Sequence, residues 1–522
     1  MGKFNKKSEG TKKRSFEGGI VYDRKNEDAW INMLFGCMLS PQFYESSETQ
    51  TDRFIALTQA MLKEYGPAFV MKAAHYSRNV MGMRSISALA AALVNAERCE
   101  GKRLFYAHYF RRPDDVAEVF AAVEMLGGKP SHGLMRGACD YLCRLDAYRL
   151  GKYKLEGKSY NIYDLVNLTH AHSGAIELLK KGTLPVPETW ETRLSVCRND
   201  DQKKEAWMDL VASGKLGYLA LIRNVRNICK SVKDEAWISE SLFPRLVDRD
   251  AIRRAMVFPY TIYTAWRMLN GELYKGDASG TLMRGFEKTL SEAFLFAAGN
   301  IPKFSGSTLS VVDCSCSMTI SISPKSRVSY KDISAVYASL FSKRYSSNEI
   351  SGADDMTIVF GSEARKFTAS SGDSIFQTIH KLGNSQVGGS TFIDKIYPLV
   401  TRHFDRIFLF SDMQVADPAS WCLSSGSRGW ETRNGLSGDC KTFQKWFSEY
   451  ARAYGKCHVY SFDLANAEGQ VLRTDGPISY MTGLNDKVFT FVSLIESGRS
   501  LVDEIQAYDY LQVQGDKEDA EV

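Results

Sequence analysis

Apolar residues recur with a period near 3.6 over most of the first 300 residues. The stretch 51–65 shows this pattern, with Phe54, Leu57 and Met61 on one face of a predicted helix. Gly and Pro separate successive stretches, as in the Gly-Pro pair at 66–67. Similar periodicity predicts helices at 67–80, 84–98, 114–126, 133–150, 203–213, 216–232, 248–270 and 281–298. Many helices without a strand signal indicate a solenoid-like stack, although no strict sequence period is present.

From about residue 305 the pattern changes to alternating strands and helices. Short apolar runs predict strands at 308–313, 355–361, 405–411 and 456–463. Helices are expected near 329–345, 373–382, 392–402, 440–453 and 485–497. This alternation is typical of a doubly wound parallel sheet, which binds its ligands at the C-terminal ends of the strands. We therefore expect a multidomain chain, with an all-α region at 16–304 followed by an α/β domain at 305–500.

Five oxygen-bearing side chains lie at the ends of these predicted strands or in a loop between them: Asp313, Ser315, Ser317, Thr391 and Asp412. Carboxylate and hydroxyl oxygens are the donors that a hard cation such as Mg²⁺ prefers. The five residues therefore predict a site for Mg²⁺ or another divalent cation. Taken singly, Asp313 could instead cap a helix, and Ser315 and Ser317 could be ordinary loop hydroxyls.

Composition places the chain among soluble globular proteins. Of its 522 residues, 44% are hydrophobic and 24% are charged, and the length predicts two or three domains. Its 11 cysteines are odd in number and have no repeated spacing; Cys139 and Cys143 lie one helical turn apart, but nothing nearby completes a zinc site. These features predict a reduced, cytoplasmic compartment. No run is long enough to span a bilayer, and the N-terminus is too polar for a secretory signal.

Charge is distributed unevenly along the chain. Residues 1–300 carry 44 Lys and Arg against 35 Asp and Glu, whereas residues 301–522 carry 22 against 26. A basic first part favours an anionic partner, although a solvated surface would have a similar composition. Residues 1–15 carry six cations and one acid and are expected to be a disordered basic arm. Residues 501–522 carry seven acids and one Lys and are expected to be a solvated acidic tail.

Several segments, in their order, resemble the TROVE family of RNA-binding proteins over roughly residues 27–500. They are LFGCMLSPQFY (34–44), AAHYSRNVMGMRSISALAAAL (73–93), HGLMRGACDYLCRLDAYRLGKYK (132–154), YNIYDLVNLTHAHS (160–173), WETRLS (190–195), LGYLALIRNVRNI (216–228), LVDRDAIRRAMVFPYTIYTAWRML (246–269) and the junction GNIPKFSGSTLSVVD (299–313). The metal set resembles the metal-ion-dependent adhesion site of von Willebrand factor A domains. That family usually has Gly between the two serines, where this chain has Cys316, so the loop must accommodate a side chain there.

The resemblance implies a fold and a set of partners. It implies a ring of HEAT-like helical repeats with a basic central hole, closed by the A domain. Family members bind small structured noncoding RNAs (Y RNAs) on the outer surface of the ring. They also take single-stranded ends of misfolded RNAs through the hole, and in bacteria the complex can be tethered to an exoribonuclease.

Candidate RNA contacts come partly from the residues and partly from the resemblance. Arg223, Arg226 and Lys230 recur at helical spacing opposite an apolar face, where they could neutralise phosphates, although a solvated helix face has the same pattern. The family's RNA-contacting segment aligns with His170, a residue that could equally be a surface or capping histidine. Lys152 and Lys154 flank Tyr153, which suits a backbone-plus-stacking contact or simply a turn after a helix. The same argument adds Arg84, Arg136, Arg253 and Arg254.

Three classes of function compete. The first is a non-enzymatic scaffold that binds noncoding RNA, and the second is a metal-dependent adaptor that binds a protein through the A domain. An enzyme is the third. The sequence lacks a P-loop, an H-E-x-x-H motif, a Cys/His nucleophile pair and the dense acidic cluster of a nuclease. We therefore expect no catalytic activity.

Overall fold

The computed structural model describes the following residues: 12–14, 20–22, 25–37, 39, 46–153, 155, 157–186, 189–273, 279–322, 326–342, 354–415, 443–465, 471, 477–482 and 487–512. The chain divides into two compact units. One, called here the helical unit, comprises Met33–Ser40, Ser47–Ala255 and Leu494–Val522. The other, the sheet unit, comprises Met1–Asn32, Pro41–Ser46 and Met256–Ser493.

The helical unit consists of successive short helices, and α1 (Asn26–Gly36) spans the boundary between the units. Its helices are α2 (Ser47–Tyr65), α3 (Pro67–Asn79), α4 (Ser85–Ala96), α5 (Lys102–Tyr109), α6 (Pro113–Met125), α7 (His132–Cys143), α8 (Ala147–Lys152), α9 (Ile162–Thr169), α10 (Gly174–Lys180), α11 (Trp190–Ser195), α12 (Asp200–Ala212), α13 (Tyr218–Val232), α14 (Glu235–Trp237), the π-helical turn Ile238–Leu242, α15 (Phe243–Leu246), α16 (Arg249–Arg254) and α25 (Leu501–Ala507). The all-α character predicted for this region is confirmed.

Local signals explain where these helices begin and how closely they pack. The helix predicted at 133–150 is two helices, because Asp146 accepts a hydrogen bond from the Arg149 backbone N–H at 2.7 Å and so caps α8. Likewise, the stretch predicted as one helix at 248–270 ends at Arg254 and resumes at Pro259. Helices α5 and α7 approach closely at Gly137, where a Cβ atom would lie 2.6 Å from the Arg103 carbonyl oxygen.

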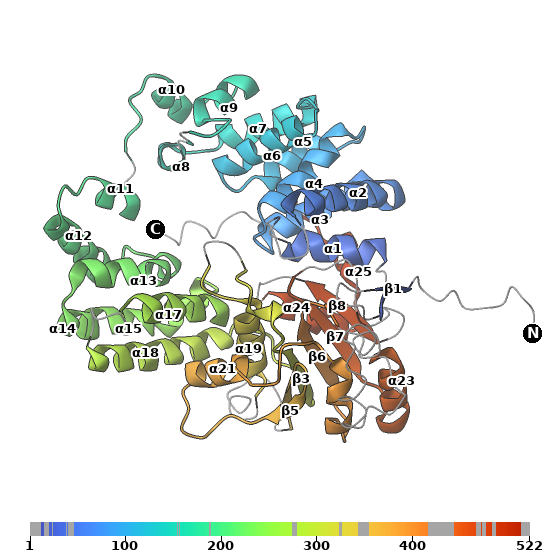
Figure 1. Cartoon of the computed structure of the whole chain (residues 1–522). Helices are drawn as coiled ribbons and strands as arrows, with labels where there is room; N and C mark the ends of the chain where they lie inside the picture. Colours follow the sequence, from blue (N-terminus) through green and yellow to red (C-terminus); the bar gives the residue numbers. More distant parts are fainter. Residues whose placement is uncertain are drawn as a thin grey trace, which may run out of the picture. The chain divides into compact units, whose positions relative to one another are not determined.

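The sheet unit holds a six-stranded sheet with the order β5-β4-β3-β6-β7-β8, flanked by helices (Figure 1). Its elements are α17 (Pro259–Leu273), α18 (Gly280–Ala298), β3 (Thr308–Asp313), the 3₁₀ turn Ser317–Thr319, α19 (Tyr330–Leu340), β4 (Met356–Phe360), β5 (Ala364–Phe367), α21 (Ile375–Gly383), the 3₁₀ helix Ile393–Leu399, β6 (Arg406–Ser411), α23 (Phe443–Tyr454), β7 (His458–Asp463), β8 (Ile478–Thr482) and α24 (Val488–Glu496). All neighbouring strands are parallel except β4 and β5, which pair antiparallel.

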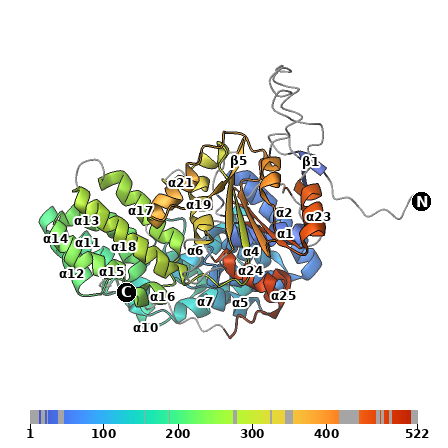
Figure 2. The same cartoon turned by 90° about the horizontal axis from the view of Figure 1, so that it is seen from below.

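Helices cover both faces of this sheet (Figure 2). On one face, Phe408 of β6 packs against Phe341, just after α19, and against Phe489 of α24, with ring centroids 5.0 and 6.0 Å apart. On the other face, alternate strand residues such as Leu309 and Leu409 form a buried cluster with α23. Burial of both faces explains why the central strands read as continuous apolar runs.

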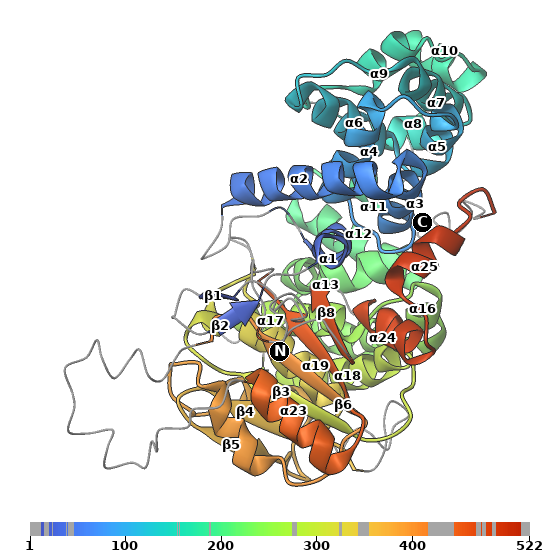
Figure 3. The same ribbon diagram turned by 90° about the vertical axis from the view of Figure 1, so that its right-hand side faces the viewer.

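The structure differs from the sequence-based prediction at both ends of the chain. Lys12–Arg14, within the arm predicted to be disordered, is strand β1 and pairs antiparallel with β2 (Ile20–Tyr22). Part of the predicted solvated tail is helix α25, which packs on α3 (Figure 3) and buries Ile505. A capping box between Ser500 and Asp503 starts α25, so its acids serve the helix N-terminus.

The expected boundary at residue 304 also differs from the structure. Helices α17 and α18 belong to the sheet unit, where Tyr263 donates a hydrogen bond to Asp332 of α19 at 2.6 Å. The aromatic rings of Trp266 and Phe376 stack at 5.2 Å and join α17 to α21. The segment predicted as a helix at 392–402 is a 3₁₀ helix, with Pro398 inside it. Across the described parts of the chain, no helix has the length and apolar character needed to cross a membrane.

Candidate metal and RNA-binding sites

The ends of β3 and β6 bring the two predicted metal-binding carboxylates together. These strands are parallel neighbours in a register that pairs Val312 with Phe410. Asp313 and Asp412 therefore both lie at the C-terminal edge of the sheet and are buried. Ser411, which precedes Asp412, donates a hydrogen bond to Asp313 Oδ2 at 2.7 Å. Ser411 is not among the predicted ligands, although it directly precedes Asp412 at the end of the strand.

Asp313 sits in surroundings that disfavour its charged form. Burial, together with the neighbouring Asp412 carboxylate, raises its pKa to about 7. Hydrogen bonds from Ser411 and from the Ser315 backbone N–H, the latter at 2.9 Å, oppose this shift. Burial also raises the pKa of Asp412, against a hydrogen bond from Ser317. A cation between the two carboxylates would remove the unfavourable charge.

The hydroxyl groups of the predicted set complete the fit. The Ser315 and Ser317 oxygens lie 3.2 Å apart. Thr391 is fully buried, and its Oγ1 has no hydrogen-bond partner within the described structure. A buried hydroxyl without a partner is costly unless a ligand satisfies it. No group of three or more His, Cys, Asp and Glu among the described residues could hold a metal, and this set has only two such acids. Its chemistry, mostly oxygen from hydroxyls, fits Mg²⁺.

Cys316 fits between the two serines without backbone strain. Its φ of −62° and ψ of −39° are ordinary right-handed values that any L-residue adopts. Its backbone N–H donates to the Gly389 carbonyl at 3.0 Å. A Cβ atom on Gly389 would lie 2.7 Å from the Cys316 sulfur, so glycine there leaves room for the thiol. The loop carrying Thr391 is thereby held against the loop carrying the serines.

Helix α13 presents the predicted basic face. Residues such as Leu221, Ile222 and Val225 are buried on one side, while Arg223 and Lys230 are exposed and Arg226 is half-buried. Asn227 donates from its side chain to Asn224 at 3.1 Å. The amphipathic reading of this segment is confirmed, and it leaves the cations within reach of phosphate oxygens.

The other candidates occupy separate helices of the helical unit. His170 is the exposed C-cap of α9 and has a left-handed φ of 55°, so it is the capping residue considered as the alternative. Lys152 is exposed at the end of α8, with its ammonium 5.8 Å from the Tyr153 ring centre. Arg136 is exposed on α7. Lys154 lies outside the described residues.

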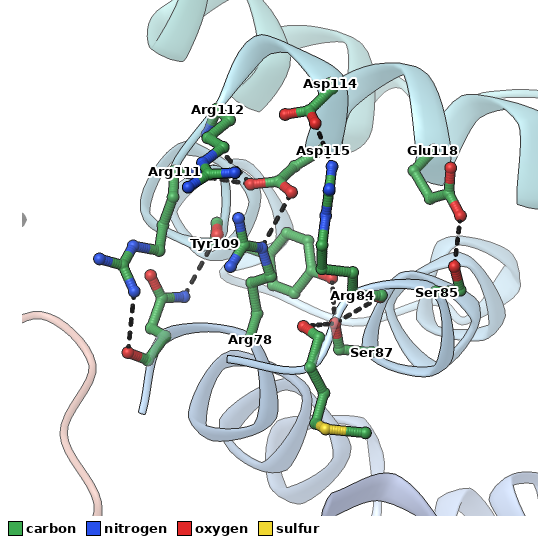
Figure 4. Close-up of polar contacts among 12 residues, drawn as sticks. Arg78, Arg84, Ser85, Ser87, Tyr109, Arg111, Arg112, Asp114, Asp115 and Glu118 are labelled. Atoms are coloured by element: carbon green, nitrogen blue, oxygen red, sulfur yellow. Dashed lines mark hydrogen bonds and ion pairs between the residues drawn. The ribbon is translucent and has the colours of Figure 1, made fainter. Parts of the chain in front are cut away.

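Arg84 has a partner within the helical unit. It forms an ion pair with Asp114 at the start of α6, beside the buried pair of Arg78 and Asp115 (Figure 4). Ser85 donates to Glu118 at 2.7 Å in the same group. The charge of Arg84 is therefore offset locally.

Residues 170–292 match the family model described as TROVE domain. The matched part includes His170 and the basic face of α13, whereas Arg84, Arg136 and Lys152 precede it. No curated protein matches the chain. Among solved structures, the chain is similar to the crystal structure of the Ro (Rsr) protein of Deinococcus radiodurans, with 15% identity and a TM-score of 0.61.

That similarity extends over 89% of this chain and 99% of the Deinococcus chain. It therefore covers both the helical part and the sheet with its helices. The predicted fold class, helical repeats followed by an α/β domain, is confirmed. In its fold, the chain is similar to the Deinococcus Ro protein.

Proposed function

We propose that this protein is an RNA-binding scaffold that recognises small structured noncoding RNAs of the Y type. It also takes single-stranded ends of misfolded RNAs and so serves RNA quality control, with an exoribonuclease as its partner. The observation that carries the proposal is the TROVE match over the exposed basic face of α13. The proposal includes no catalytic step.

The arrangement of α13 supports this use. Its apolar side is buried, so the helix is fixed and its three cations are held on the solvent side at one-turn spacing. Cations positioned in this way neutralise phosphates and release counterions, which makes binding salt-dependent. Because A-form duplex is read by shape and backbone contacts, a fixed row of cations suits structured RNA.

Filter binding of a blunt RNA hairpin to the full chain tests the proposal. Replacing Arg223, Arg226 and Lys230 together by Gln should weaken binding about tenfold or more. The slope of the logarithm of the binding constant against the logarithm of the salt concentration should become shallower by about one for each residue replaced. A matched control neutralises three exposed lysines of other helices, Lys63, Lys203 and Lys288. Equal losses in both variants would indicate general charge attraction, and no binding at low salt would overturn the proposal.

His170 and Lys152 are tested separately against RNA shape. His170 lies within the part that matches the TROVE model, and Lys152 lies in a segment that resembles the family, so replacing both should weaken binding of a blunt hairpin. The cations of α13 should matter more for a hairpin with a single-stranded 3′ tail, since a single strand can follow a positive groove. A tail that adds no affinity to the unmutated protein would remove the support for binding of single-stranded ends.

A second candidate function is a metal-dependent adaptor that binds a protein. The unpartnered hydroxyl of Thr391 beside two buried carboxylates favours it. Asp313, Ser315, Ser317, Thr391 and Asp412 would hold Mg²⁺, which could then bind an acidic side chain from a partner. A pull-down with and without Mg²⁺ tests this function. Retention of the same protein by the Asp412→Ala variant would exclude it.

A further inference from the structure

Three helices of the sheet unit enclose a cavity of about 590 Å³. Helices α17, α18 and α21 lie side by side in two perpendicular views (Figures 1 and 2). Ser374, the N-cap of α21, donates a hydrogen bond to Glu287 of α18, which fixes one side of the cavity. A volume of this size is in the range of sites for small molecules and cofactors. The metal site and the basic face of α13 use none of the lining residues.

The floor of the cavity is aromatic. Trp266 stacks on Phe376 with ring planes only 8° apart, and both rings are buried. Tyr263 adds a third ring, 6.1 Å from Phe376, and its hydroxyl is directed to Asp332. Such a floor offers a flat apolar surface to a planar group.

The rim of the cavity is cationic and rich in amides. Its basic side chains are Arg267, Arg284, His380 and Lys381, and its amides are Asn270 and Gln377. Glu287 is the one acid among the described lining residues. Lys381 is paired with Asp373 at 2.8 Å, so its charge is partly offset. Arg284 is exposed and donates to a neutral partner, the Thr281 hydroxyl, at 3.2 Å. The rim therefore favours an anion, and its amides can hydrogen-bond a polar ring edge.

A second, polar cavity of about 580 Å³ adjoins the first and shares Arg267 and Asn270 with it. Arg327 and two serines, Ser321 and Ser326, line the rest. Arginines and hydroxyls are typical ligands of phosphate oxygens. The Arg327 guanidinium occupies the space over Gly271, where a Cβ atom would clash with it. Glycine at this position leaves the guanidinium room to lie in the cavity wall.

Arg267 stands between the two cavities with unused hydrogen-bonding capacity. Its Nε is buried and has no hydrogen-bond partner in the described structure. Its ion pair with Asp332, at 3.6 Å, is longer than a hydrogen bond. Asp332 is already committed to Tyr263 and to the capping box of α19. Its Nη2 donates to a neutral acceptor, the Arg327 carbonyl oxygen, at 3.3 Å. An anion between the cavities would give the Arg267 guanidinium a charged acceptor.

From this juxtaposition we infer that the paired cavities bind a nucleoside phosphate, with the base over the Trp266 floor and the phosphate between Arg267 and Arg327. The ligand is either a free mononucleotide or the end of an RNA strand, since both present a planar base next to a phosphate. An apolar lipid would gain nothing from the arginines of the rim, and a purely anionic ligand would leave the aromatic floor unused. The site is separate from the proposed surface for structured RNA.

Equilibrium dialysis of the full chain with labelled adenosine 5′-monophosphate tests the inference. Adenosine without the phosphate should bind at least about tenfold more weakly, because it loses charge-assisted hydrogen bonds. Arg284→Gln and Arg267→Gln should each cause a loss of similar size. Arg284 is exposed, so its variant should fold even if the Arg267 variant does not. Lys288→Gln makes the same charge change on α18 outside the cavity and should bind normally.

Competition distinguishes the two sources of the ligand. A linear pentanucleotide should displace the labelled nucleotide if the site takes RNA ends, whereas a circular RNA of the same sequence should not. If neither RNA competes, the free nucleotide is the ligand. Two results would overturn the inference. One is that neither the nucleotide nor the linear RNA binds, and the other is that Arg284→Gln leaves their binding unchanged. Binding of a blunt hairpin, measured in parallel, reports on the proposed RNA scaffold independently.

Discussion

Two buried carboxylates, one in each unit, have opposite electrostatic surroundings. Asp115 of the helical unit accepts a hydrogen bond from Arg78 Nε at 2.9 Å and two from the backbone N–H groups of Arg111 and Arg112 at 3.0 Å (Figure 4). Asp313 of the sheet unit receives hydrogen bonds from neutral groups and faces a second buried carboxylate, Asp412. The first charge is satisfied within the chain, while the second requires a proton or a cation from outside.

This difference separates a structural charge from a binding site. A buried acid that is paired with an internal cation is already satisfied and offers nothing to a ligand, and removing either partner is costly. A buried acid beside another acid costs stability until something binds. The orphaned Thr391 hydroxyl points to the same conclusion for the Asp313 site, because a fold gains nothing from an unmade hydrogen bond.

The largest expected effect is the loss of metal binding when either acid of the sheet unit is removed. Asp313→Ala or Asp412→Ala should abolish Mg²⁺ binding, measured by calorimetry, since each deletes one of two charged ligands from a single ion. Binding of a blunt hairpin RNA should stay within about twofold, because structured RNA is proposed to use the helical unit. Parallel loss of Mg²⁺ and RNA binding would show that the two sites are not separate.

The next effect is on stability in the helical unit. Asp115→Ala should lower the free energy of unfolding by about 3–5 kcal/mol, because it leaves Arg78 buried without its partner. Asp114→Ala removes the more exposed pair with Arg84 and should cost less than about 1 kcal/mol. Urea unfolding of both variants measures this contrast. A similar cost for the two would mean that burial of the ion pair does not control its contribution.

A smaller effect concerns a buried group that stays neutral. Burial lowers the pKa of His75 to about 4, below its ordinary value of 6.5, so the unfolded chain takes up a proton first as the pH falls. Its contribution to stability is therefore complete above pH 6.5. Roughly 3 kcal/mol should be lost as the pH falls to about 4. Unfolding of the His75→Asn variant at pH 7 and pH 5 should show a weaker pH dependence than the unmutated chain.

The half-buried His458 in the sheet unit provides a control for that measurement. Burial also lowers its pKa to about 4, and its Nε2 lies 2.9 Å from the Ser479 hydroxyl. His458→Asn should remove a similar share of the pH dependence. If neither variant changes it, the acid sensitivity of the chain arises from groups other than these two histidines.

The proximity of the Asp313 and Asp412 carboxylates could be predicted from the sequence, because the topology of a parallel sheet brings the ends of its strands together. The central strands β3, β4, β6 and β7 lie within one or two residues of their predicted positions. The residues after parallel strands meet at one edge, so the meeting of Asp313 and Asp412 followed. The edge strands were missed, since β5 (ARKF) is charged and half-exposed and lacks the apolar run of a central strand.

The helical unit was less predictable because helical periodicity gives the buried face of each helix and not its neighbours. The basic face of α13 was predicted correctly, but the ion pair between Arg84 and Asp114 joins residues 30 positions apart. Helix α25 was missed because seven acids in the last 22 residues outweighed the Ser-x-x-Asp capping pattern at its start. Charge counts describe a segment's average, whereas one buried residue such as Ile505 fixes its position.

The smallest expected effect is a change in the free energy of unfolding whose sign should differ between Asp313 and Asp115. In the metal-free chain at pH 8, Asp313 is charged against its surroundings, because its pKa is raised to about 7. A raised carboxyl pKa means that stability falls as the pH rises from about 4 towards and beyond 7. Asp313→Asn keeps the shape without the charge and should stabilise the metal-free chain by about 1–2 kcal/mol at pH 8, after allowance for a poorer fit to its donors. The gain should vanish near pH 5, where the unmutated carboxyl is protonated. Saturating Mg²⁺ should reverse it, since the ion stabilises the charged form.

Asp115→Asn should destabilise the chain under all three conditions, because Arg78 loses its counter-charge. Urea unfolding of the two variants decides the matter, and a loss of stability for Asp313→Asn at pH 8 would place Asp313 with Asp115 as a structural charge.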